Sequence, residues 1–175
     1  MGWQADVTIP HRDKCIICVA PHTSNWDFIL GELYYGAIGR TAGFLMKKEW
    51  FFWPLGIFFR RIGGIPVYRS RKTSLTDQIA EKARHAEKME LAITPEGTRS
   101  LATTWKRGFY FIALKAGLPI QLYAIDYEHK RIVCQREIIP SGDVDADMRS
   151  IMDYYRPYKG KYPGKFAVEE IEPTK

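Results

Sequence analysis

The sequence is poor in cysteine and has no long hydrophobic run. Its 175 residues include three cysteines, Cys15, Cys18 and Cys134, and this small, odd number favours a reducing compartment over a disulfide framework. The longest apolar run, WFFWPLGIFF at residues 50–59, is about half as long as the roughly 20 residues that a membrane-spanning helix needs. The sequence therefore predicts neither a disulfide-stapled secreted module nor a transmembrane helix.

Three further signals are missing. The start of the chain, MGWQADVTIP, lacks the basic segment and apolar core of a signal peptide, so we expect a cytoplasmic protein. There is no G-x-S-x-G nucleophile elbow, which argues against a hydrolase built on that motif. Cys15 and Cys18 form a C-x-x-C pair inside an apolar run, but residues three apart in a strand face opposite sides. We therefore expect buried thiols there and no metal site.

The composition is that of a soluble globular domain with a basic surface. Apolar residues make up 46% of the chain and charged residues 26%, and the net charge is +6. A positive charge favours anionic partners such as phosphates, nucleic acid or an anionic membrane surface. Basic residues are interleaved with acidic ones and no nucleic-acid motif is present, so we do not expect a nucleic-acid partner. The length fits a single domain over residues 1–175.

Apolar segments alternate with helical patterns along the chain. Short apolar or β-branched runs predict the strands. Amphipathic spacing marks the helix at 74–89, and cap or stop residues such as Gly117 and Pro157 mark others. The expected strands are 15–20, 43–47, 65–68, 90–94, 119–128 and 131–138, and the expected helices are 25–38, 50–61, 74–89, 106–116 and 143–156. This order predicts an α/β fold: a mostly parallel mixed sheet flanked by helices on both faces.

Three polar motifs follow predicted strands. PHTSNWD follows the first strand, PVYR ends the third and TPEGTRS follows the fourth. Ligands of open parallel sheets bind beyond the carboxyl ends of the strands. We therefore expect the three motifs to gather at one edge of the sheet.

His22 and Asp27 of the first motif are candidates for acid–base chemistry. A neutral imidazole can take a proton from a hydroxyl near pH 7, and a carboxylate on its other nitrogen would orient the ring. The alternative is a polar turn between a strand and a helix, with Asp27 in the first helical turn for its favourable dipole interaction.

The other two motifs suit an anion. Glycine in TPEGTRS allows an exposed turn that presents amide donors, and arginine can grip a phosphate with two hydrogen bonds. The candidates are Glu96, Gly97, Thr98 and Arg99 in that turn, and Arg69 at the end of the third strand. Each motif taken alone also fits a solvated turn or a basic surface loop.

Together the motifs resemble a known family. PHTSNWD resembles the H-x4-D motif of the glycerolipid acyltransferases, which act on glycerol 3-phosphate and 1-acylglycerol 3-phosphate. TPEGTRS is similar to the family's FPEGTRS signature, GGIPVYR to its arginine-ended block and GLPI (117–120) to its fourth block. The order and approximate spacing agree over residues 15–125, the expected core of the domain.

The resemblance implies an O-acyltransferase with His22 as general base oriented by Asp27. The donor would be acyl-CoA or acyl-carrier protein, and the acceptor 1-acylglycerol 3-phosphate or another lysophospholipid, including an amino-acid-linked one. Arg69, Arg99 and Glu96 would hold the acceptor's phosphate and glycerol, with oxyanion donors near residues 97–98. No metal or cofactor is implied. A hydrolase using the same pair, and a non-catalytic binder of anionic lipid or nucleic acid, stay open as alternatives.

The aromatic segment 47–61 carries a second expectation. Trp50, Phe51, Phe52 and Trp53 lie between basic residues, a pattern typical of an element that contacts anionic headgroups at a membrane surface. The alternative is a helix buried in the core. The first interpretation predicts a protein held peripherally at the cytosolic face of a membrane.

Overall fold

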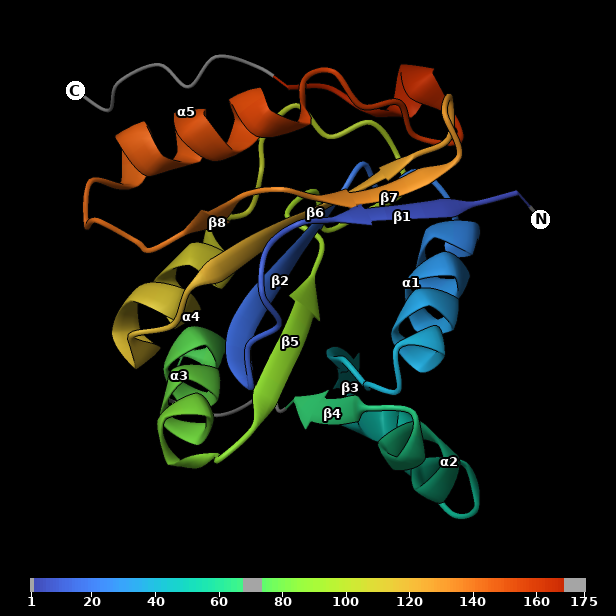
Figure 1. Cartoon of the computed structure of the whole chain (residues 1–175). Coiled ribbons are helices and arrows are strands. Elements are labelled where there is room, and N and C mark those ends of the chain that lie inside the picture. The colour runs from blue at the N-terminus through green and yellow to red at the C-terminus, as the bar shows by residue number, and fades with distance from the viewer. Residues whose placement is uncertain (1, 68–73, 169–175) are drawn as a thin grey trace.

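The structure is a computed structural model that describes residues 2–67 and 74–168 (Figure 1). The strands are β1 (Gln4–Val7), β2 (Lys14–Ala20), β3 (Gly43–Lys47), β4 (Gly64–Val67), β5 (Met89–Ile93), β6 (Ile120–Asp126), β7 (Arg131–Cys134) and β8 (Glu137–Ile138). The α-helices are α1 (Asn25–Ala37), α2 (Leu55–Arg61), α3 (Leu75–His85), α4 (Gly108–Ala116) and α5 (Val144–Tyr155). Two short 3-10 helices are η1 (Lys48–Trp50) and η2 (Pro163–Lys165).

The strands form one mixed sheet in the order β1-β7-β6-β2-β5-β3-β4, and β8 pairs with β6. β2 lies between β5 and β6 and is parallel to both, and β3 is parallel to β4 and β5. β6 is antiparallel to β7 and β8, because a short turn brings the chain straight back along β6. The predicted fold class, a mostly parallel α/β sheet, is confirmed.

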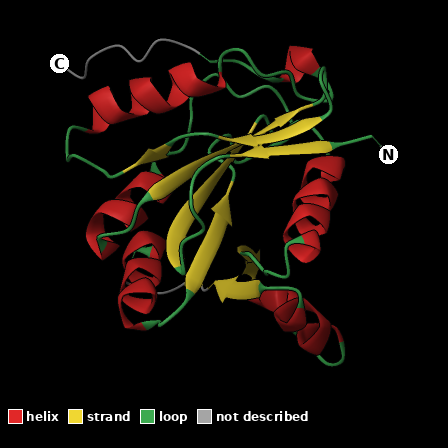
Figure 2. Ribbon diagram, viewed as in Figure 1, coloured by secondary structure: helices red, strands yellow, loops and turns green. Residues whose placement is uncertain are grey.

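Helices cover both faces of the sheet, unequally (Figure 2). Side chains of β2 alternate between the faces: Ile16 and Cys18 join the core cluster with α3, α4 and α5, whereas Cys15 and Ile17 join a smaller cluster with α1. The two cysteines of the C-x-x-C pair are buried and belong to opposite faces, as the strand periodicity predicts.

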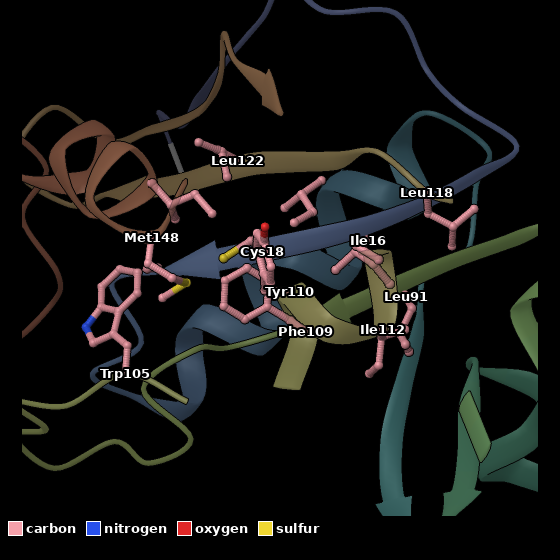
Figure 3. Packing of buried hydrophobic residues seen from close by; sticks show 14 of the residues in the cluster. Ile16, Cys18, Leu91, Trp105, Phe109, Tyr110, Ile112, Leu118, Leu122 and Met148 are labelled. Atoms are coloured by element: carbon pink, nitrogen blue, oxygen red, sulfur yellow. The ribbon is translucent and has the colours of Figure 1, made fainter. Parts of the chain in front are cut away.

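The larger cluster provides most of the core (Figure 3). Phe109 and Tyr110 of α4 and Leu122 of β6 are each at most 1% exposed. Burial of one such side chain contributes roughly 1.5–3 kcal/mol. The Tyr155 hydroxyl of α5 donates to the Cys18 carbonyl oxygen at 2.6 Å, so the helix is also tied to the central strand by a polar contact.

Some predicted elements differ from the structure. The helix expected at 50–61 is split into η1 and α2, with Pro54 as the N-cap of α2. The helix expected at 74–89 ends at His85, because the chain is already extended at Ala86 before it enters β5. β1 was not expected: it is a short edge strand with a polar sequence, QADV, and its pairing with β7 is set by tertiary contacts.

No helix in the described residues is long and apolar enough to cross a bilayer.

Candidate active site

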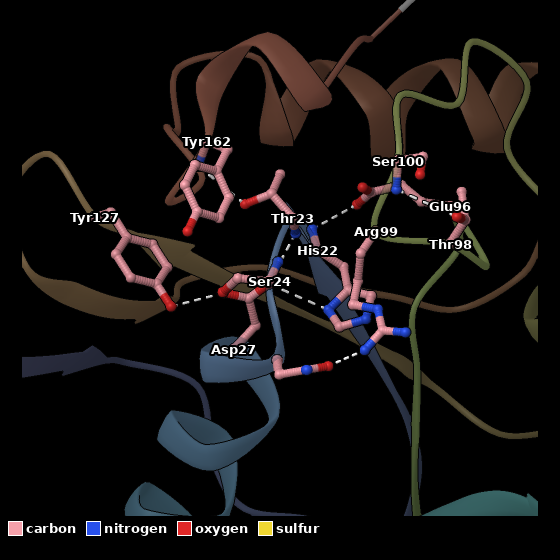
Figure 4. A network of polar contacts seen from close by, with 11 residues as sticks. His22, Thr23, Ser24, Asp27, Glu96, Thr98, Arg99, Ser100, Tyr127 and Tyr162 are labelled. Atoms are coloured by element: carbon pink, nitrogen blue, oxygen red, sulfur yellow. Dashed lines mark hydrogen bonds and ion pairs between the residues drawn. The ribbon is translucent and has the colours of Figure 1, made fainter.

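The motif PHTSNWD forms the loop between β2 and α1 together with the first residues of α1, and it brings His22 and Asp27 together (Figure 4). Ser24 is the N-cap of α1, so Asp27 lies in the first helical turn and points back over the loop. Nδ1 of His22 lies 3.2 Å from Oδ2 of Asp27, and the two side chains are 18% and 1% exposed. The turn therefore acts as a scaffold for the pair, so the two interpretations of the motif are compatible.

Asp27 is held by a dense set of hydrogen bonds. Oδ2 accepts from the backbone N–H groups of Thr23 and Ser24 at 2.8 Å each, and Oδ1 accepts from the Ser24 hydroxyl at 2.9 Å and the Tyr127 hydroxyl at 2.7 Å. Burial alone would raise the pKa of Asp27, but the contacts with His22, Tyr127 and Ser24 outweigh burial and lower it. Asp27 is therefore a carboxylate that can orient a histidine and stabilise its protonated form.

The two ring nitrogens of His22 have different surroundings, and Nδ1 is the one that is buried near Asp27. Nδ1 is within reach of Asp27 but is not aligned as a hydrogen bond to any described residue. Such contacts are often loose before substrate binds. Because Nδ1 faces the carboxylate, Nε2 lies on the opposite side of the ring from Asp27.

Glu96 contacts the backbone of His22 from the turn after β5. Its side chain is 2% exposed, and Oε1 accepts from the backbone N–H of His22 at 2.8 Å. Oε2 is buried and has no hydrogen-bond partner among the described residues. Burial raises the pKa of Glu96 to about 7, with a smaller contribution from the nearby charge of Asp27 and an opposing one from His22.

The turn after β5 places Arg99 at the same edge as His22. Gly97 has a φ of +64°, a left-handed backbone conformation that favours glycine. The Gly97 N–H donates to the Thr94 carbonyl at 3.1 Å and closes the turn. Arg99 donates to the side-chain oxygen of Asn25, which links the turn to the start of α1.

A pocket of about 560 Å³ opens beside His22 and Arg99 and runs between α1 and the sheet. Apart from these polar residues at its head, its wall is largely apolar and comes from β2, α1, β3 and β5. Its apolar lining residues are Val19, Phe28, Ile29, Phe44, Leu45, Ala92 and Ile93. Periodicity could not separate these residues from core residues, and the sequence analysis did not identify them.

The pocket continues toward a small cavity. A space of about 50 Å³ shares Val19, Gly31 and Ala92 with it and is otherwise lined by residues such as Tyr34 and Tyr123. A side chain at Gly31 would meet no atom within 4 Å, so this glycine borders open space. The pocket therefore has a volume and an apolar wall that suit a hydrocarbon chain.

The family model described as Acyltransferase matches residues 6–126. The chain belongs to the acyltransferase family. None of the curated proteins compared with the chain matches it. The match confirms the expected membership of an acyltransferase family, and the matched segment contains His22, Asp27 and the turn with Glu96 and Arg99.

One residue predicted for the site is not described in the structure, and one further group of possible ligands, not predicted from the sequence, is present. Arg69 falls outside the described residues, although β4, which ends at Val67, is parallel to β3 and points to the same edge of the sheet. Asp126, Glu128 and His129 offer ligand atoms within 4.8 Å of one another, but Arg131 and His129 already contact the Asp126 carboxylate. Ion pairing explains this group.

The aromatic segment of the acyltransferase is not buried in the core. Trp50, Phe52 and Trp53 are 53%, 55% and 83% exposed, and Phe51 is half-buried under Phe59 and Arg60. The interpretation of 50–61 as a buried core helix is therefore wrong.

Proposed function

We propose that this acyltransferase moves a fatty acyl chain from acyl-CoA or acyl-carrier protein to a free hydroxyl of 1-acylglycerol 3-phosphate or a related lysophospholipid. The observation that carries the proposal is the His22–Asp27 pair at the head of an apolar pocket. A base next to a hydrocarbon-sized pocket is what acyl transfer to an alcohol needs.

In the proposed reaction, Nε2 of His22 takes the proton of the acceptor hydroxyl as its oxygen attacks the thioester carbonyl carbon. The tetrahedral intermediate expels the thiolate, the C–S bond breaks, and His22 returns the proton to sulfur. The products are the acylated lipid and a free thiol, so atoms and protons balance with no further reactant. Asp27 keeps the ring oriented and stabilises its protonated form.

The surrounding residues have separate proposed roles. Arg99 is the ligand for the acceptor's phosphate, together with Arg69, because a guanidinium binds phosphate with two hydrogen bonds. The Thr98 amide is the proposed oxyanion donor, since the Gly97 amide is already bonded to Thr94. Glu96 is buried behind His22, and we propose that it holds the loop; the glycerol contact expected from the sequence would require it to turn outward.

Membrane attachment through the aromatic segment belongs to the same proposal. Trp50, Phe52, Trp53, Ile57 and Phe58 are all more than half exposed, and Lys47, Lys48, Arg60 and Arg61 flank them. Exposed aromatic rings beside basic residues suit the headgroup region of an anionic bilayer. Phe28 and Ile29 of α1 are also partly exposed and line the pocket, which gives a lipid chain an apolar path into it.

Two assays test the proposal. The purified protein is given a radiolabelled acyl thioester with and without a panel of lysolipids, and wild type is compared with His22→Ala. We expect lipid product with wild type and a loss of at least about 10²-fold in the variant. Thioester loss that needs no acceptor would favour the hydrolase instead, and full activity without His22 would refute the assignment.

Vesicle flotation tests the membrane surface. We expect binding to vesicles that contain anionic lipid, and weaker binding for Trp53→Ser. Ile139→Ser is the matched control, because Ile139 is 77% exposed and lies after β8, outside the aromatic segment. Equal loss for both variants, or no binding of wild type, would contradict the proposal.

A further inference from the structure

The catalytic carboxylate has one partner that comes from far along the chain. Three of the hydrogen bonds to Asp27 come from its own loop, from Thr23 and Ser24. The fourth comes from the Tyr127 hydroxyl, which donates to Oδ1 at 2.7 Å from the end of β6, 100 residues away (Figure 4). Local bonds hold Oδ2 toward His22, whereas Oδ1 accepts from the Ser24 hydroxyl and, from outside the loop, from Tyr127 among the described residues.

Tyr127 is itself held on two sides. Its backbone N–H donates to the Lys159 carbonyl at 2.9 Å, which ties it to the C-terminal loop. Its ring packs edge-on against Trp3, with the ring centres 5.0 Å apart and the planes at 88°. Trp3 directly precedes β1, so the unexpected edge strand places a bracing ring next to the tyrosine.

The tyrosine is suited to donate and does not line the pocket. Burial, together with the bond to Asp27, raises its pKa, so the phenol keeps its proton. Tyr127 is not among the residues that line the pocket beside His22, so it acts on the reaction only through Asp27.

We propose that Tyr127 is a positioning residue for acyl transfer: its hydroxyl fixes the Asp27 carboxylate against His22, and Trp3 braces its ring. A carboxylate held by fewer donors can turn about its side-chain bond and misorient the imidazole. The N-terminal segment thereby takes part in the geometry of the pair, although its sequence carries no catalytic residue. The kinetic part of this inference rests on the proposed function.

The test compares Tyr127→Phe with wild type at saturating substrates across a range of pH. We expect kcat to fall about tenfold, because a hydrogen bond to a charged group is lost, while KM for both substrates stays within about twofold. The acid limb of the pH–rate profile, which reports the coupled His22–Asp27 pair, should move to higher pH because Asp27 loses a donor. The other groups facing the pair, Glu96 and Arg99 and, beside Tyr127, Tyr162, stay unchanged in this variant.

Tyr162→Phe is the matched control. Tyr162 also lies beside the catalytic loop, where its backbone N–H donates to the Thr23 hydroxyl oxygen at 3.2 Å, a contact that the substitution keeps. We expect its kcat and pH profile to match wild type. Thermal melting of all variants separates lost stability from lost positioning.

A second measurement does not depend on activity. The ¹⁵N shifts of the His22 ring, assigned by comparison with His22→Gln, report which nitrogen carries the proton. We expect the Nδ1–H tautomer in wild type and a mixture in Tyr127→Phe. If tautomer and pH profile are unchanged in that variant, the inference is wrong; if wild type itself transfers no acyl group, the proposed function is wrong and the ring shifts still decide the role of Tyr127.

A double-mutant comparison tests the bracing ring. If Trp3 acts through Tyr127, Trp3→Ala lowers kcat by less than Tyr127→Phe, and the double variant is no slower than Tyr127→Phe alone. If the double variant instead showed the product of the two single reductions in kcat, Trp3 would not act through Tyr127.

Discussion

The two faces of the sheet are built from the same strands but serve different ends. On one face α3, α4 and α5 pack into a continuous core that includes Phe109, Leu122 and Met148. On the other face α1 meets a smaller cluster and leaves a pocket of about 560 Å³ beside the strands. Close packing gains stability from every methylene, whereas a binding pocket has to leave apolar surface without a partner. We therefore expect the packed face to contribute most of the stability of the fold, whereas the other face provides the pocket beside His22.

The contrast is sharpest between two large side chains. Leu122 on the packed face is 0% exposed, whereas Phe28 on the pocket face is 43% exposed. We expect Leu122→Ala to lower the free energy of unfolding by about 2–5 kcal/mol, because it leaves a cavity. Phe28→Ala removes a side chain that already borders open space, so we expect a loss of about 1 kcal/mol or less. Urea unfolding of both variants measures the difference.

Activity should show the reverse order. Leu122→Ala, kept below its melting temperature, should retain most of its turnover. Phe28→Ala should lose turnover with long-chain donors, because Phe28 lines the pocket. Equal destabilisation by the two substitutions would mean that the faces do not differ in packing.

Glu96, in the turn after β5, is a buried carboxyl group whose ionisation destabilises the folded protein. Its pKa is raised from 4.5 to about 7, so the folded protein holds this proton more tightly than the unfolded chain does. This contribution to stability is therefore lost as pH rises from about 4.5 to about 7, on the order of 3 kcal/mol. Glu96→Gln cannot ionise but keeps an acceptor for the His22 amide. We expect the free energy of unfolding of the variant to rise relative to that of wild type as pH increases from about 4.5 to about 7. Urea unfolding at several pH values measures this change.

Glu137 provides a control of the same residue type with the opposite sign. A hydrogen bond from Arg12 lowers its pKa, so its contribution to stability is present above about pH 4.5 and is lost at lower pH. Glu137→Gln should therefore be less stable than wild type at neutral pH and equally stable in acid. If the difference in stability from wild type changed with pH in the same direction for both variants, the raised pKa of Glu96 would not be the cause of the change.

Most of the fold could be predicted from the sequence because its central strands, β2 and β6, are buried on both sides. Apolar runs such as 15–20 and 90–94 have no competing interpretation once helices lie between them, and the parallel sheet follows from that order. β1 could not be predicted, since QADV has neither an apolar run nor a strong alternation, and its place depends on pairing with β7. Helix ends were also displaced where the next strand imposed an extended backbone, as at Ala86.

The site could be predicted only where its residues are close in sequence. His22 and Asp27 lie in one loop, and the sequence predicted the pair that the structure brings to 3.2 Å. Tyr127 is 100 residues from Asp27, and nothing in its own neighbourhood marks it as a partner. The depth of Glu96 could not be read from its motif either, because burial depends on the loops that close over it.

The smallest expected effect lies inside α1, at Gly31. Glycine within a helix costs up to about 1 kcal/mol relative to alanine, and no packing contact explains it here, since an added Cβ would meet nothing within 4 Å. We expect Gly31→Ala to raise the free energy of unfolding by about 0.5–1 kcal/mol. Gly36→Ala is the matched control: Gly36 also lies in α1 with open space around it, but it does not line the pocket.

The two glycines should separate stability from function. Both alanine variants should be more stable in urea, but only Gly31→Ala should disfavour a palmitoyl donor relative to a decanoyl donor, and Gly31→Leu more strongly. Each methylene that loses its place in the pocket should reduce kcat/KM about fourfold, the equivalent of about 0.8 kcal/mol. If Gly31→Ala and Gly36→Ala had the same chain-length preference, the space beside α1 would not hold the acyl chain. The pocket would then not explain the glycine at position 31. The two faces of the sheet would differ in packing but not in a role in binding the acyl chain.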